Sequence, residues 1–179
     1  MILGKSYLGG TEIEKIYLGA NVAYEAGVAG TEIYLDDNAA SISDINSTGA
    51  TTGNFRWSTV KSSINSIDTD SYDGTYSLEL KATSAATSYA QYRFEVTNGV
   101  QYKVSFWYKV PVYGSQRFRA LTGWVETGLT VSLTATVWTY FETTLTASET
   151  GVPSAFFYTG FPAAIDDTLF IDNMSILEL

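Results

Sequence analysis

The sequence predicts an all-β protein: an antiparallel two-sheet jelly-roll β-sandwich with a short N-terminal β-hairpin repeat segment. Three observations predict this fold. Aromatic residues make up 15% of the 179 residues, and this composition suits pleated, half-buried strands better than helices. Several segments alternate apolar and polar residues with a period of two, as half-buried strands do. Turn sequences rich in Gly, Asn and Asp separate these segments at short intervals.

The first 26 residues contain an internal repeat with an offset of ten residues. Ser6–Ile13 (SYLGGTEI) is echoed by Ile16–Ala23 (IYLGANVA). Each copy reads as a short strand, a Gly turn and a second strand. Two copies bury little surface by themselves, so we expect residues 1–26 to pair with another chain or to dock on the main domain. Residues 27–30 (GVAG) are small and contain two glycines, and we expect them to form a linker.

Residues 31–179 read as one β-domain of about ten short strands, a number and spacing typical of a sandwich or jelly roll. Turn signals such as Asp73-Gly74, Asn98-Gly99 and Thr127-Gly128 separate them. The predicted strands are Thr31–Leu35, Phe55–Val60, Tyr76–Ala82, Tyr89–Val96, Gln101–Val110, Gln116–Val125, Leu129–Leu133, Val137–Thr146, Ala155–Tyr158 and Thr168–Leu177.

The segment Gln101–Val110 shows the clearest alternation. One face of this strand holds Tyr102, Val104, Phe106 and Tyr108, and the other holds Lys103, Ser105, Trp107 and Lys109. A strand with one apolar and one polar face is typical of antiparallel sheets in a two-layer sandwich. We expect Trp57 and Trp124 to be core or subunit-contact residues.

The charge and the missing residue types exclude several function classes. The net charge is -9, so a phosphate backbone would be repelled and we expect no nucleic-acid partner. Cys and His are both absent, which excludes disulfides, thiol nucleophiles, His bases and the usual zinc sites. No stretch is long and apolar enough to span a membrane, and the first residues do not resemble a signal peptide. We therefore expect no membrane insertion, and release by cell lysis is one route to the outside.

Four segments, taken in order, resemble strands of the carbohydrate-binding modules of families 4, 9, 16 and 22. They are Asp73–Leu80 (DGTYSLEL), Asn98–Val110 (NGVQYKVSFWYKV), Val137–Leu145 (VWTYFETTL) and Leu169–Ile176 (LFIDNMSI). The resemblance covers most of residues 31–179. It implies a two-sheet jelly roll, commonly a structural calcium ion, and often a sugar-binding cleft on the concave face.

The N-terminal repeat resembles a different group, the tail and other virion proteins of bacteriophages. The similarity lies in residues 12–19 (EIEKIYLG) and covers about 25 residues in all. It implies a virion or extracellular location, and because virion fibres are commonly trimeric it suggests a homotrimer.

The resemblance to carbohydrate-binding modules also implies a calcium ligand. The closing strand's Asp, here Asp172, helps to bind calcium in that family, and Asp36 and Asp37 follow the first strand and could supply further oxygens. Calcium takes about six to eight oxygen ligands, often including backbone carbonyls. The alternative is that Asp172 caps a turn or accepts hydrogen bonds from backbone N–H groups.

Four side chains are candidates for glycan binding. Sugar rings stack on flat indole and phenol rings, and arginine hydrogen-bonds their hydroxyls. The candidates lie away from the apolar faces of their strands: Trp107, Tyr140, Arg93 and Arg119. The alternative is packing, because β-sandwiches use many aromatic residues in this way.

An enzymatic reading would need two paired carboxylates about 5–9 Å apart across a cleft. Glu95, Glu126 and Glu142 qualify by residue type only. Acidic residues on so acidic a chain are usually solvated surface, so we expect no enzyme.

The first interpretation is a non-catalytic structural or adhesion protein of a phage particle, such as a fibre, tail or capsid-decorating subunit. Its repeats would anchor it to its own copies or to other virion proteins, and its jelly roll would hold host surface glycans for host attachment. The alternative is a carbohydrate-binding module detached from a polysaccharide-degrading enzyme. A third interpretation is an assembly spacer that binds no sugar.

Overall fold

We describe the protein from a computed structural model. The residues that it describes are the strands at 15–18, 21–25, 31–35 and 45–46, together with residues 56–179 except 113, 121–122, 152–153 and 161. Side chains are described from residue 57 onward, apart from those same positions and 154–156. Every regular element in this part of the chain is a β-strand, which confirms the predicted all-β class. No helix in the described part is long and apolar enough to cross a membrane.

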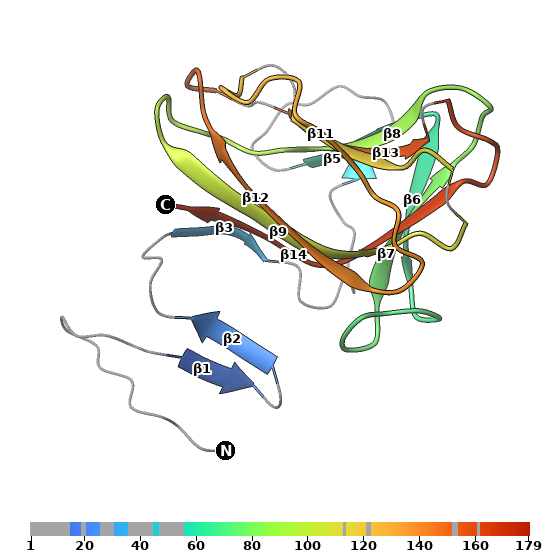
Figure 1. The fold of residues 1–179 in the computed structure, drawn as a ribbon, viewed down its shortest axis with the longest axis horizontal. Coiled ribbons are helices and arrows are strands. Elements are labelled where there is room, and N and C mark those ends of the chain that lie inside the picture. The colour runs from blue at the N-terminus through green and yellow to red at the C-terminus, as the bar shows by residue number, and fades with distance from the viewer. Residues whose placement is uncertain are drawn as a thin grey trace.

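Two sheets stack face to face and enclose the core (Figure 1). We call them the upper and lower sheets, as they lie in that view. In spatial order the upper sheet holds β11 (Thr130–Ser132), β10 (Arg117–Ala120), β13 (Ser154–Gly160), β8 (Ser88–Arg93), β5 (Arg56–Val60) and β4 (Ile45–Asn46). The lower sheet holds β12 (Thr139–Thr146), β9 (Gln101–Lys109), β14 (Thr168–Glu178), β7 (Ser77–Ala82) and β6 (Ser62–Ile67), with β3 (Thr31–Leu35) also paired to β14. All pairings are antiparallel except β4 with β5, so the predicted sandwich is confirmed.

The N-terminal segment contains the predicted hairpin. β1 (Lys15–Leu18) pairs antiparallel with β2 (Asn21–Glu25). The two strands expected for the second repeat copy are therefore present. The first copy lies outside the described residues. Figure 1 shows the hairpin beside the sandwich rather than within either sheet.

The core lies between the inner faces of the two sheets and is rich in aromatic rings. Phe106 on β9 is fully buried and packs against Phe157, Phe118 and Phe141 with ring centroids 5.1, 5.7 and 4.9 Å away. The predicted inner face of β9 is confirmed, because the exposure of its four apolar residues does not exceed 8%. Trp57 and Trp124 are also buried core residues.

Three strand predictions differ from the structure. β6 was not predicted, because its sequence SSINSI contains only two apolar residues and these do not reveal which face is buried. Lys61 takes a positive φ of 53° between β5 and β6, so the chain passes from the upper to the lower sheet in one residue. The predicted strand 116–125 ends at Ala120, and the predicted strand 89–96 ends at Arg93. Beyond these ends only isolated bridges continue, at Trp124 and Val96.

Candidate functional site

The outer face of the lower sheet brings together two of the predicted glycan-binding residues. Trp107 on β9 lies opposite Tyr140 on β12 in the strand register, and their rings are 5.6 Å apart. Tyr140 is 48% exposed, and its hydroxyl donates a hydrogen bond to Glu142 at 2.8 Å. The two aromatic residues therefore share one surface, as a stacking site would require.

The indole of Trp107, however, is already stacked. Residues 68–76, which join β6 to β7, fold back over this sheet, and Tyr72 lies on Trp107 with centroids 3.6 Å apart and planes within 10°. Tyr72 therefore covers one of the two faces of this indole, and Tyr140 lies tilted beside it. In this structure Trp107 packs a loop against the sheet, which is the alternative role that the sequence left open.

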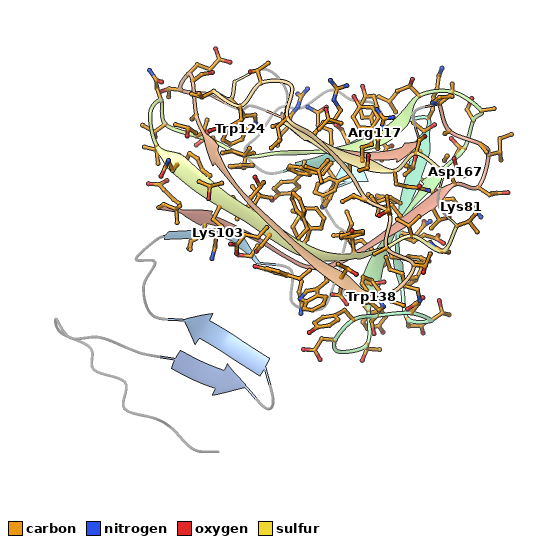
Figure 2. The ribbon with its side chains drawn as sticks, viewed as in Figure 1. Lys81, Lys103, Arg117, Trp124, Trp138 and Asp167 are labelled. Atoms are coloured by element: carbon orange, nitrogen blue, oxygen red, sulfur yellow. The ribbon has the colours of Figure 1, made fainter. Side chains whose placement is uncertain are left out.

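Polar contacts hold the same loop in place. Asp70 accepts hydrogen bonds from the indole Nε1 of Trp138 at 3.0 Å and from the ammonium of Lys109 at 2.5 Å. The backbone carbonyl of Asp70 accepts a third from the hydroxyl of Ser77 at 2.6 Å. Figure 2 shows Trp138 beside this loop, below the lower sheet. The loop is thus fixed by stacking on one side and by a carboxylate on the other.

Asp172 on β14 anchors the loop from beneath. Its side chain is fully buried, and one carboxylate oxygen accepts the backbone N–H groups of Tyr72 at 2.7 Å and Asp73 at 3.2 Å. The other oxygen accepts the N–H of Asn173 at 2.8 Å. This is the acceptor role that the sequence left open for Asp172.

Only a few oxygen-bearing side chains among the described residues could bind a calcium ion at Asp172. The neighbouring Asn173 has a buried side-chain oxygen with no hydrogen-bond partner among the described residues, the kind of atom that a cation would satisfy. No group of three acidic residues that could hold a metal occurs among the described side chains. Asp36 and Asp37 lie outside the described residues. Asp172 and Asn173 supply two oxygen-bearing side chains of the six to eight ligands that calcium takes, so calcium stays a prediction.

The other two predicted residues, Arg93 and Arg119, lie on the opposite side of the sandwich. Both occupy outward-facing positions of the upper sheet, on β8 and β10, where they alternate with the buried Tyr92 and Phe118. A single stacking surface made of Trp107, Tyr140 and both arginines is therefore wrong as an arrangement. Two separate strands of the upper sheet carry the arginines, and two strands of the lower sheet carry the aromatic pair.

The arginines of the upper sheet have aromatic neighbours that were not among the predicted glycan-binding residues. Across the register, Arg117 lies opposite Tyr158, which lies opposite Tyr89. The two tyrosine rings are 5.4 Å apart, and the guanidinium of Arg119 lies 5.6 Å from the centroid of the Tyr158 ring. Figure 2 shows Arg117 on the upper sheet. We call these outward residues of β8, β10 and β13 the arginine face.

The arginine face also contains groups suited to hydrogen bonding. Gln91 lies between Tyr89 and Arg93 along β8 and accepts a hydrogen bond from Arg93 at 3.5 Å. Burial, followed by repulsion from Tyr158, raises the pKa of Tyr89 above its usual 10.0, while Arg93 lowers it. Tyr89 therefore keeps its proton at neutral pH and can donate a hydrogen bond. Period-two alternation along β8 places Tyr89 on the same face as Arg93, and the pairing of β8 with β13 and of β13 with β10 brings Tyr158 and the other arginines beside them.

The three glutamates considered for catalysis lie in three different segments of the chain: on β12, between β10 and β11, and after β8. Glu142 pairs with Lys103 at 3.6 Å on the lower sheet. Glu126 accepts the backbone N–H of Thr146 at 2.7 Å. Glu95 is exposed and follows the end of β8.

Comparison with solved structures identifies proteins with a similar fold. The CBM22-1–GH10 modules of Clostridium thermocellum endo-1,4-beta-D-xylanase 10B, complexed with xylohexaose, align at a TM-score of 0.54 and 16% identity over 82% of this chain. The CBM22-1 xylan-binding domain of Paenibacillus barcinonensis Xyn10C aligns at 0.53 and 14% identity over 86% of this chain and 97% of its own length. The C-terminal family 22 module of the Clostridium xylanase aligns at 0.51 and 15% identity, over 82% of this chain and 92% of that one.

These alignments establish the fold. The chain is a jelly-roll sandwich of the carbohydrate-binding-module type, as the sequence predicted. It spans 28% of the first Clostridium structure, which also contains further modules. No protein-family profile matches the sequence, and no curated protein matches it.

Proposed function

We propose that this chain is a non-catalytic carbohydrate-binding module and that its glycan lies on the arginine face. The observation that carries the proposal is the combination of the fold with that face: three arginines, two tyrosines and a glutamine side by side on one sheet of a carbohydrate-binding-module jelly roll. The partly exposed ring of Tyr89 offers apolar surface to the sugar, and the guanidinium groups offer hydrogen bonds to its hydroxyls, while Tyr158 and Gln91 are buried and support these groups.

The arginine face supports the proposal better than the lower sheet does. On the lower sheet the flat face of Trp107 is covered by Tyr72, so a sugar would have to displace a loop held by Asp70 and Asp172. On the upper sheet Arg119 covers the ring of Tyr158, which is 5% exposed, so the groups that a sugar would meet are the partly exposed Arg119 and Tyr89. A preformed surface binds without this reorganisation cost.

A glycan array tests the proposal when wild type is compared with two matched variants. Tyr89→Ala removes an aromatic ring from the arginine face, and Tyr140→Ala removes one from the lower sheet. We expect a defined set of glycans to bind wild type and Tyr140→Ala, and to bind Tyr89→Ala at least about tenfold more weakly, about 1.4 kcal/mol. Retention by Tyr89→Ala together with loss by Tyr140→Ala would place the site on the lower sheet instead.

The alternative drawn from the sequence, a binding module separated from a polysaccharide-degrading enzyme, fits the solved neighbours at least as well as a particle protein does. The fibre, tail or decoration role rests on the N-terminal repeat alone. We keep as a proposal that residues 1–26 join copies of this chain, a trimer included. Light scattering tests it: deletion of residues 1–26 should reduce the assembly to a folded monomer, and an unchanged mass would contradict it.

A further inference from the structure

All arginines of this chain lie in one sheet. The sequence has four of them, and they occupy strands β5, β8 and β10 of the upper sheet: Arg56, Arg93, Arg117 and Arg119. Arg56 lies opposite Arg93 in the register of β5 and β8. The lysines lie elsewhere, with Lys81, Lys103 and Lys109 on the lower sheet. Within the strands of the two sheets, arginine therefore occurs in the upper sheet and lysine in the lower sheet.

The described strands of the upper sheet carry no negative charge. These six strands contain no Asp, Glu or Lys, so arginine is their only charged residue. The chain as a whole has 19 acidic residues and a net charge of -9, and strands of the lower sheet contain Glu79, Glu142 and Asp172. Glu95 is the acidic residue that follows β8. A cationic sheet on so acidic a protein favours an anionic ligand through charge complementarity.

The positions of the arginines suit a ligand with repeated negative groups. Arg117 and Arg119 are two residues apart on β10, which separates their backbones by about 7 Å along the strand. Arg93 lies two strands away, across β13, which is about 10 Å across the sheet. One small anion cannot reach all of them, whereas an extended polymer lying across β10, β13 and β8 can.

We infer that the ligand is an acidic polysaccharide whose uronate carboxylates pair with the arginine face, an inference that rests on the proposed function and names its substrate class. The planar guanidinium matches a carboxylate with two parallel hydrogen bonds, which the ammonium of lysine cannot do. This explains why the face holds arginine and no lysine. Tyr89, which is partly exposed, contacts the uncharged part of each sugar, and the buried Gln91 supports Arg93 from within the sheet.

Polygalacturonate and its methyl-esterified form test the inference on the unmodified protein. The two polymers share one sugar backbone, and esterification removes the negative charge. In affinity electrophoresis or calorimetry we expect polygalacturonate to bind at least about tenfold more tightly than the ester. Arg117→Gln and Arg119→Gln should each weaken polygalacturonate binding, and Arg119→Lys should restore it only in part. Lys103→Gln, on the other sheet, is the matched control and should bind as wild type does.

The outcomes separate the inference from the proposed function. Wild type could bind the ester or neutral xylan as tightly as polygalacturonate or more tightly, and Tyr89→Ala could lose that binding. This result would leave a glycan site on the arginine face and overturn the acidic ligand. Tighter binding of dextran sulfate or of an acidic protein would overturn the uronate assignment. Loss of binding in Lys103→Gln but not in Arg119→Gln would place the anion elsewhere. Circular dichroism of each variant shows that it is folded, and the comparison of the two polymers on wild type needs no variant.

Discussion

Replacement of Asp172 by alanine tests the account of the loop that covers the lower sheet. The carboxylate of Asp172 is fully buried and accepts three backbone N–H groups, two of them from Tyr72 and Asp73 in the loop. The substitution removes the acceptor and leaves these donors without it. The loop then loses its hydrogen bonds to β14, and Tyr72 loses the support that keeps it on Trp107.

The size of the effect follows from the number of hydrogen bonds lost. Hydrogen bonds to a charged group contribute about 1.5–3 kcal/mol each, and neighbouring bonds are not additive. We therefore expect Asp172→Ala to lower the free energy of unfolding by about 3 kcal/mol. For a chain of this size, that corresponds to a decrease in Tm of roughly 6–12 °C. Asp172→Asn keeps one acceptor oxygen, and we expect a loss of roughly half as much.

Urea unfolding measures this loss. Tryptophan fluorescence reports on the four tryptophans of the chain, Trp107 included, and far-UV circular dichroism follows the sheets. Both should be measured with chelator and with added calcium, because a loss that persists in chelator comes from the hydrogen bonds rather than from a metal. A change of less than about 0.5 kcal/mol, the usual range for surface substitutions, would refute the anchoring role of Asp172.

Four further predictions follow from the same structure. Tyr72→Ala should uncover Trp107 and shift its fluorescence to longer wavelength while glycan binding stays unchanged; weaker binding would make the Tyr72–Trp107 pair part of the site. Phe106→Ala should lower the free energy of unfolding by about 3–5 kcal/mol, measured by urea unfolding, and a loss below about 1 kcal/mol would contradict the central position of this ring. Burial raises the pKa of Tyr89, so this tyrosine loses its proton at a lower pH in the unfolded chain than in the folded one. Its contribution to stability is present below a pH of about 10 and should decrease as the pH rises through the folded pKa. The free energy of unfolding, measured between neutral and alkaline pH, should decrease less in Tyr89→Phe than in wild type, and an identical pH dependence would contradict this. Chelator should lower Tm by several degrees if calcium binds at Asp172, and an unchanged Tm would remove the calcium prediction.

The strand pattern made much of the fold predictable. Tyr102, Val104 and Phe106 alternate with polar residues, and the structure buries all three. Period-two alternation identifies a face because one side of the sheet must leave water. β6 escaped prediction because Ile64 is the one buried residue of its six.

The candidate site was less predictable because it depends on contacts between distant segments. Alternation showed that Trp107 lies on the face opposite the core, but not that Tyr72, 35 positions earlier, would cover it. Alternation likewise could not show that Arg93 and Trp107 belong to different sheets. Both strands are amphipathic, and the order of strands in space decides which outer faces coincide. The clustering of arginine in three predicted strands was visible in the sequence, and it would have pointed to the upper sheet once those strands were paired.

A titration followed by amide chemical shifts tests the central claim, that the arginine face binds a glycan, most directly. An oligogalacturonate added to isotopically labelled protein should shift backbone amides of β8, β10 and β13 in a saturable way. It should leave the amides of β9 and β12 unchanged. Saturable shifts confined to β9 and β12, or no saturable shift with any glycan that the array identifies, would contradict the account.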